Sequence, residues 1–176
     1  GRVHHWRLDA PNKDKEKLNR FFVSRRPEVL FAEFVLLVEG VAEELILPVI
    51  FEARAKQRFP DGDRENLTQR DFRRFLSEKL QICAVHSVDF KPYVHLLTTQ
   101  GSNSPSSARV YVLTDSDEER DQPTGNHSSP GESRRVELIK VVEDSGFPLG
   151  RFQVCITPVT FEKELVFWAG RTGCEP

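Results

Sequence analysis

The chain has no methionine and three cysteines among its 176 residues. The cysteines, Cys83, Cys155 and Cys174, are odd in number and far apart, so they fit reduced thiols better than a disulfide framework or a zinc site. A chain of this length without methionine, even at position 1, is expected to be an excised part of a longer protein.

The sequence also lacks long apolar runs and an excess of charge of one sign. No run reaches membrane-spanning length, and the first residues have neither the pattern of a signal peptide nor that of a transit peptide. The net charge is -2 and the pI is about 6.3, which excludes the global basic field of a self-sufficient DNA-binding domain. We expect a cytoplasmic protein without a membrane partner. Any binding of DNA must then use a local basic surface or be supplied by another part of the protein.

Apolar segments that read as buried strands alternate with amphipathic segments that read as helices. Strands are predicted at 34–38, 82–88, 110–113 and 154–156, and helices at 13–22, 41–58, 68–80, 92–99, 136–143 and 157–168, with loops at 101–107 and 120–133. Strands separated by helices require crossover connections. The sequence therefore predicts an α/β fold with a mainly parallel four-stranded sheet and helices on both faces.

Acidic residues follow three of these strands. Glu39 and Glu43 surround the turn after the first strand, Asp115 and Asp117 follow the third, and Glu162 follows the fourth. Because the carboxyl ends of parallel strands meet at one edge, we expect these side chains to gather there. Asp115 and Asp117 point the same way if the chain is still extended between them. Solvated helix caps and acidic loop starts are the alternative interpretation.

Crowded carboxylates repel one another unless cations compensate them. Oxygen ligands without Cys or His favour Mg²⁺ or Mn²⁺ over Zn²⁺. Two such ions, roughly 3.5–4 Å apart, are the usual apparatus for hydrolysing a phosphodiester. The pattern therefore favours a two-metal site, with Glu39, Asp115 and Asp117 as the catalytic carboxylates.

An ordered set of short motifs extends this hypothesis. It comprises Leu30-Phe31-Ala32, Val35 to Gly40, Glu43-Glu44, Leu47-Pro48, Leu113-Thr114-Asp115, and Thr157-Pro158 through Glu162. The set resembles the Toprim domain of primases, topoisomerases and nucleases. More narrowly, from about Arg25 to Leu165, it is similar to the OLD (overcoming lysogenization defect) family of ATP-dependent endonucleases.

The resemblance implies metal-dependent DNA cleavage, with two Mg²⁺ or Mn²⁺ ions held by five carboxylates. These are Glu39, Glu43, Asp115, Asp117 and Glu162. Glu44 matches a neighbour that we expect to be structural. The family also carries a catalytic lysine beyond the helix that starts near Glu162, and the sequence ends at Pro176 before that point; Lys163 is too close to Glu162 to take its place. The activity of this chain alone is therefore in question.

The same resemblance divides the chain. Residues 1–10 would be the last strand of a preceding ATPase module with its linker, 11–33 a helical lead-in, 34–170 the Toprim catalytic domain and 171–176 a truncated tail. The sequence has no G-x-x-x-x-G-K-[ST] loop, so ATP would act only through an ATPase module of the same full-length chain. The sequence leaves open whether that full-length protein forms a homo-oligomer.

DNA is the expected partner. Arg25, Arg26, Arg54 and Arg58 are weak candidates for phosphate contacts, since basic residues on surface helices more often only solvate a face. Two other functions stay open. One is another Toprim enzyme, such as a primase or topoisomerase fragment, and the other is a non-catalytic module that binds metal or a partner.

Overall fold

The computed structural model describes residues 12–19, 21, 28–29, 32–58, 69–99, 108–117, 129–158 and 160–171. Its strands are β1 (Phe34–Val38), β2 (Leu80–Ala84), β3 (Arg109–Asp115) and β4 (Phe152–Thr157). Its helices are α1 (Asn12–Leu18), α2 (Val41–Arg58), α3 (Gln69–Glu78), α4 (Lys91–Thr98), α5 (Pro130–Asp144) and α6 (Phe161–Arg171), with a 3₁₀ turn η3 (Leu149–Arg151).

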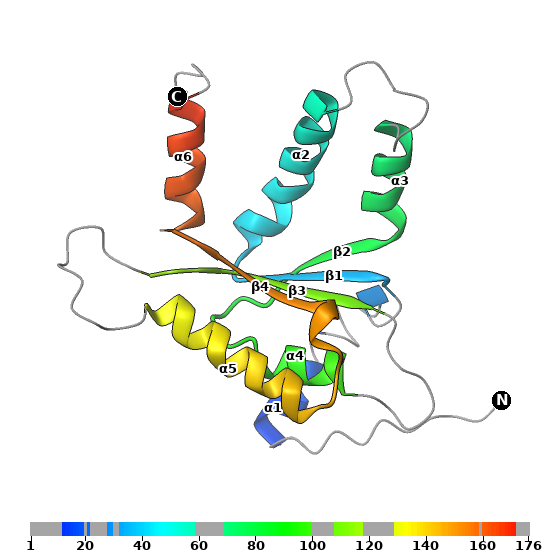
Figure 1. Cartoon of the computed structure of the whole chain (residues 1–176), viewed down its shortest axis with the longest axis vertical. Helices are drawn as coiled ribbons and strands as arrows, with labels where there is room; N and C mark the ends of the chain where they lie inside the picture. Colours follow the sequence, from blue (N-terminus) through cyan, green and yellow to red (C-terminus); the bar gives the residue numbers. More distant parts are fainter. Residues whose placement is uncertain are drawn as a thin grey trace.

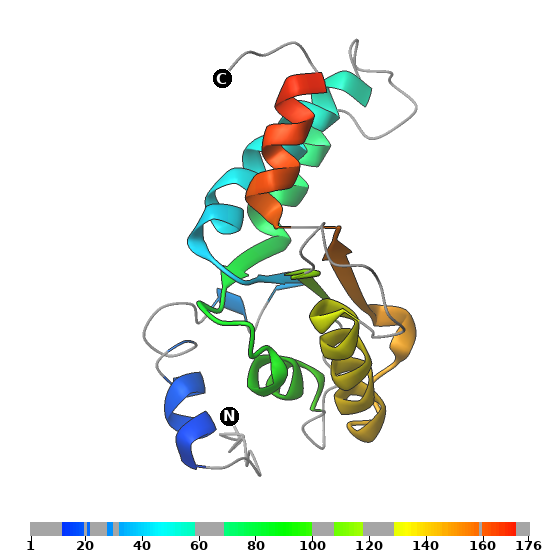
Figure 2. The same cartoon turned by 90° about the vertical axis from the view of Figure 1, so that its left-hand side faces the viewer.

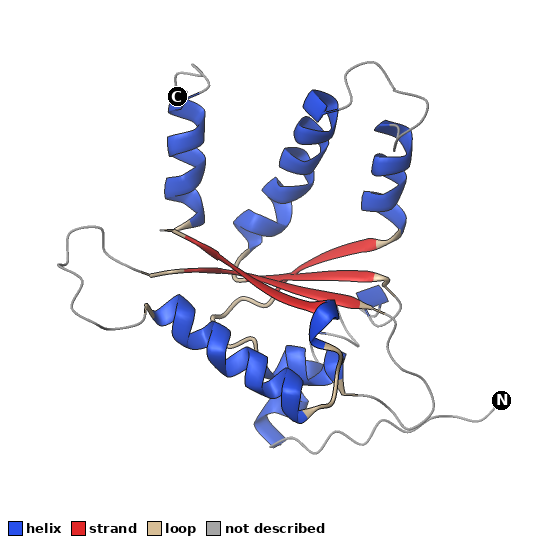
Figure 3. Ribbon diagram, in the orientation of Figure 1, coloured by secondary structure: helices blue, strands red, loops and turns tan. Residues whose placement is uncertain are grey.

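The four strands form one parallel sheet in the order β2-β1-β3-β4. Helices α2, α3 and α6 lie on one face, and α1, α4 and α5 lie on the other (Figures 1, 2 and 3). The predicted α/β fold is therefore confirmed. β1 is a central strand between β2 and β3, and helices cover both faces of the sheet, which explains why its sequence is apolar without polar alternation.

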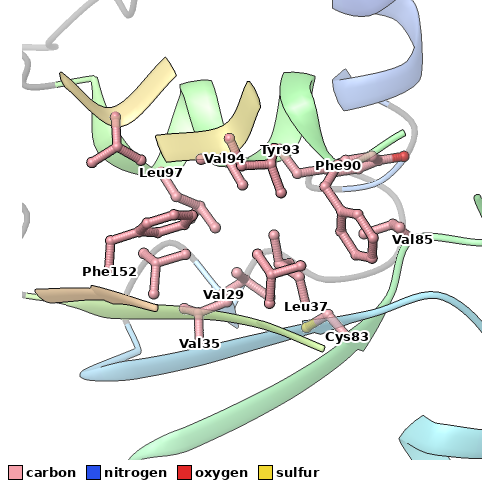
Figure 4. Close-up of a cluster of buried hydrophobic side chains, with 14 of the residues drawn as sticks. Val29, Val35, Leu37, Cys83, Val85, Phe90, Tyr93, Val94, Leu97 and Phe152 are labelled. Carbon is pink, nitrogen blue, oxygen red and sulfur yellow. The ribbon is translucent and has the colours of Figure 1, made fainter. Parts of the chain in front are cut away.

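Successive side chains of β1 point to opposite faces and enter two hydrophobic clusters. Val35 and Leu37 join the larger cluster, with residues of α4 and α5 (Figure 4). Val38 joins the smaller cluster, which includes residues of α2 and Phe161 at the start of α6. Fully burying one such aliphatic side chain contributes about 1.5–3 kcal/mol, so both clusters hold the sheet to its helices.

The helical lead-in packs onto the sheet domain. Leu18 and Phe21 are buried in the larger cluster, and the Phe21 and Tyr93 rings meet edge to face at 4.8 Å between centroids. Lys17 pairs with Asp89 at 3.0 Å. α1 therefore shares the core of the domain that follows it.

Strand β2 differs from its prediction at both ends. The segment 82–88 was expected, but the strand begins at Leu80 and ends at Ala84. The Phe34 N–H donates to the Lys79 carbonyl at 3.0 Å, so the chain has joined the sheet where a helix was predicted to continue. At the other end, His86 adopts a left-handed φ of 56°, which ends the extended conformation.

Helix α5 begins earlier than predicted. Residues 120–133 were interpreted as loop, but the helix starts at Pro130, where proline is favoured because its missing N–H is not needed. The Ser129 hydroxyl accepts a hydrogen bond from the Glu132 N–H at 3.1 Å. Ser129-Pro130-Gly131-Glu132 is thus a helix start that apolar periodicity did not reveal.

Helix α2 leaves part of its apolar surface exposed. Leu47 and Ala55 are buried, but Val41, Leu45 and Val49 lie exposed along one side of the helix.

Among the helices that the structure describes, none combines the length and the apolar character needed to span a membrane. Cys83 is a buried free thiol and Cys155 an exposed one, while Cys174 and the predicted strand within 1–10 lie outside the described residues.

Gly131 sets how closely α5 approaches the sheet. A Cβ atom there would lie 2.6 Å from the Asp115 carbonyl oxygen and 2.9 Å from the Ser116 Cα. Gly131→Ala is expected to destabilise the fold by about 1–3 kcal/mol through overpacking, which lowers the Tm by several degrees. Gly150→Ala is the control, because nothing lies within 4 Å of a Cβ built there. Thermal unfolding followed by circular dichroism compares them, and equal Tm values would contradict the close approach.

Candidate functional site

The carboxyl edge of the sheet gathers acidic residues from different strands. We call Glu39, Glu43, Asp115, Asp117 and Glu162 the acidic corner. Glu39 directly follows β1, and Glu43 lies in the first turn of α2. Asp115 is the last residue of β3, and Glu162 lies in the first turn of α6, which follows β4. This edge is on the left in Figure 1, where α2, α5 and α6 begin.

Glu39 is tied to the neighbouring strand. Its Oε1 atom accepts a hydrogen bond from the Thr114 hydroxyl at 2.5 Å and another from the Asp115 N–H at 2.9 Å. Thr114 is fully buried, and the Glu39 side chain is 18% exposed. The carboxylate at the end of β1 is therefore held against the end of β3.

The two adjacent glutamates of α2 contact different elements. Glu43 is buried, and its Oε2 atom accepts from the Gly40 N–H at 3.1 Å, which closes the turn between β1 and α2. Glu44 accepts from the Ala84 N–H at 3.1 Å, at the end of β2. The bond from Ala84 gives Glu44 the structural position expected for it. Glu43 faces the acidic corner.

Asp115 is partly buried and lies near other carboxylates of the corner. Burial raises the pKa of its carboxyl above the usual value, and the negative charges of Glu39, Glu43 and Glu162 raise it further. A hydrogen bond from the Thr157 hydroxyl to Oδ1, at 2.6 Å, acts in the opposite direction on this pKa. The three glutamates therefore lie close enough to Asp115 for their charges to act on it.

The backbone at Asp117 does not have the extended conformation that would point its side chain the same way as that of Asp115. Its φ is 54°, in the left-handed region, so the chain is not extended there and the condition for Asp115 and Asp117 to point the same way is not met. Its Oδ2 atom instead accepts a hydrogen bond from Arg134 at 2.7 Å.

Arg134 is a member of the site that the sequence interpretation missed. Its Nη2 atom also donates to the Asp115 carbonyl at 2.5 Å and lies 3.8 Å from Glu39 Oε1. The side chain is only 14% exposed. Recognising the capped helix start at Ser129 would have placed Arg134 near the end of α5 that faces the corner.

The donor chemistry of the corner fits a hard divalent cation. All five acidic side chains offer oxygen, and a nearby cation would oppose the burial and the repulsion that together raise the pKa of Asp115. As they stand, however, no three Asp, Glu, His or Cys side chains in the described parts of the chain are arranged to hold a metal.

Two of the candidate DNA contacts lie on α2, away from the corner. Arg54 is exposed and contacts Gln57, and Arg58 is the last residue of α2. At about 1.5 Å per residue, Arg54 lies roughly 20 Å along α2 from the turn at Gly40. Arg25 and Arg26 lie outside the described residues.

Comparison with known proteins gives one match. The model of the family described as overcoming lysogenization defect protein-like, TOPRIM domain, matches residues 30–117, which is half of the chain. The matched segment contains β1 to β3 and the acidic residues Glu39, Glu43, Asp115 and Asp117. No curated protein and no solved structure matches the chain.

The raised pKa of Asp115 predicts a pH-dependent effect of neutralising it. A raised folded-state pKa stabilises the fold below the unfolded value, near pH 3.9, and this contribution is lost as pH rises through the folded-state pKa. Without divalent cations, Asp115→Asn is therefore expected to raise the Tm at pH 7 and to change it little near pH 3.5.

Thermal unfolding in a chelator at both pH values measures this effect. Glu16→Gln is the control, since Glu16 is an exposed carboxylate of α1, which packs on the opposite face of the sheet from α2 and α6. A lower Tm for Asp115→Asn at pH 7 would show that the ionised carboxylate stabilises the corner instead.

Proposed function

The chain belongs to the overcoming lysogenization defect protein-like family through its TOPRIM domain, and from this premise we propose that it is the nuclease part of a metal-dependent DNA endonuclease. A domain of this family is a metal-binding domain of the nuclease and primase type. The finer assignment, phosphodiester hydrolysis with two Mg²⁺ or Mn²⁺ ions, is our proposal.

One observation carries it. Glutamates from two other strand ends act electrostatically on Asp115, and Glu39 is hydrogen-bonded to the backbone of Asp115 itself. The corner thus concentrates negative charge in a partly buried place, which costs stability unless a cation is bound. The alternative interpretation, solvated helix caps and acidic loop starts, gives no reason for acidic residues at the ends of three strands to lie close together.

The residues of the corner have separable roles in this proposal. Glu39, Glu43, Asp115, Asp117 and Glu162 would hold the cations, which when bound supply an activated water and stabilise the leaving oxygen. Thr114 and Thr157 fix the orientations of Glu39 and Asp115 through their hydroxyls. The buried Glu43 closes the turn at Gly40 and keeps this part of the corner in place.

The proposed partner is DNA, bound by Lys and Arg contacts to phosphates that weaken as salt rises. Arg54 and Arg58 could contact only DNA that extends along α2 from the corner. ATP would act through an ATPase module of the same full-length chain, in the cytoplasm, and homo-oligomerisation of that full-length protein is left open. These assignments are part of the proposal.

Nicking of supercoiled plasmid tests the activity. With the full-length protein and millimolar Mg²⁺ or Mn²⁺, Glu39→Ala and Asp115→Ala are each expected to lower the nicking rate by more than about 100-fold. Loss of a direct ligand should exceed the 10–100-fold cost of losing a residue that only orients one. Glu16→Gln is the matched control and should cleave normally.

The outcomes separate the functions left open by the sequence. Intact nicking in both alanine variants would reject the site. Primer synthesis or strand passage without net nicking would favour another Toprim enzyme. Absence of both catalysis and metal-dependent stabilisation would favour a non-catalytic module.

The contrast between Glu43 and Glu44 gives an independent prediction. Glu44→Ala leaves the Ala84 N–H without its acceptor and is expected to cost about 1–3 kcal/mol of stability. It should leave the rise in Tm caused by Mn²⁺ unchanged. Glu43→Ala should reduce that rise. Thermal unfolding with and without Mn²⁺ measures both, and an equal response in the two variants would contradict the division of roles.

A further inference from the structure

Arg134 contacts three parts of the acidic corner with one guanidinium. Its Nη2 atom donates to Asp117 Oδ2 at 2.7 Å and to the Asp115 carbonyl at 2.5 Å, and it lies 3.8 Å from Glu39 Oε1. Because an arginine stays protonated at any working pH, this is a fixed positive charge between the ends of β1 and β3. It lies among the carboxylates that the proposed cations need.

We propose that Arg134 is a positioning residue that substitutes for a divalent cation in the acidic corner, and that cation binding requires it to release Asp117. The proposal rests on the metal-binding role assigned to the corner above. Bound to Arg134, Asp117 offers one of its oxygens to the guanidinium, so the arginine and a cation compete for the same ligand.

Two features of its surroundings favour release. Arg134 Nε is buried and has no hydrogen-bond partner within the described residues, so the observed position leaves a donor unsatisfied. Arg134 also lines a hollow of about 250 Å³ together with Asp89, Lys91 and Glu137. Glu137 lies three residues further along α5, within reach of a helical neighbour, and is already paired with Lys91. The guanidinium that leaves Asp117 therefore has space beside it, next to Asp89 and Glu137, which are now paired with Lys17 and Lys91.

If Arg134 competes with the cation for Asp117, removing the charge of Arg134 should lower the stability of the metal-free chain and raise its affinity for Mn²⁺. Without metal, Arg134→Gln should lower the Tm, because it leaves the carboxylates uncompensated. With metal, the same variant should bind Mn²⁺ about tenfold more tightly, which corresponds to one charged hydrogen bond that no longer has to be broken. A residue that only positions the ligands would lose stability and Mn²⁺ affinity together.

Isothermal titration of the chain with Mn²⁺ alone, paired with thermal unfolding in a chelator, measures both effects. Arg135→Gln is the matched control, because Arg135 is the next residue on α5, is half exposed and lies 3.5 Å from Glu132. It should leave Mn²⁺ affinity and Tm nearly unchanged. Asp115→Asn should weaken Mn²⁺ binding and so reports on the corner itself.

The results distinguish the failure of each proposal. Mn²⁺ affinity in Arg134→Gln that is equal to or lower than in Arg135→Gln would overturn the competition while leaving the metal site standing. No Mn²⁺ binding in the unchanged chain or in Arg134→Gln would overturn the metal site and the competition with it. If Arg134→Gln does not fold, Arg134→Lys decides the question. Its single ammonium cannot reproduce the guanidinium contacts, so competition predicts Mn²⁺ binding tighter than in the unchanged chain.

Discussion

The hydrogen bonds from Thr114 and from the Asp115 N–H to Glu39 join the carboxyl ends of two neighbouring strands. They set the distance between the carboxylate that follows β1 and the carboxylate that ends β3. The other corner residues are arranged around this contact. Glu43 closes the turn after Glu39, and Thr157 of β4 donates to Asp115. A site built on strand ends is held by the sheet itself and not by loops.

The fold follows from simple features of the sequence. The segment Phe34–Val38 is apolar throughout, as expected for a strand covered on both faces, and it lies between β2 and β3. Crossover helices between strands then require parallel pairing. The meeting of Glu39, Asp115 and Glu162 at one edge follows from that topology alone. The boundaries of β2 could not be predicted, because the left-handed turn at His86 is a backbone property that apolar periodicity does not report.

The part of the site that escaped prediction depends on contacts between segments distant in sequence. Asp117 leaves the extended conformation and meets Arg134, which lies 17 residues further along the chain. Residues 120–133 look like a loop because they are polar and contain Pro and Gly, yet Pro130 and Gly131 begin a helix. Gly131 is needed for packing, since any side chain there would meet the Asp115 carbonyl. That close approach brings Arg134 into the corner.

An acidic site for cations faces a conflict between folding and binding. The carboxylates that attract a cation also repel one another before it arrives, and burial makes the repulsion stronger. Arg134 resolves the conflict by supplying a positive charge while the chain is metal-free. The same contact lowers cation affinity, because the ligand oxygen of Asp117 must first be released. Its unsatisfied Nε and the adjacent hollow are the two features that favour that release. Under this proposal, the arginine would set a balance between the stability of the metal-free corner and its affinity for a cation.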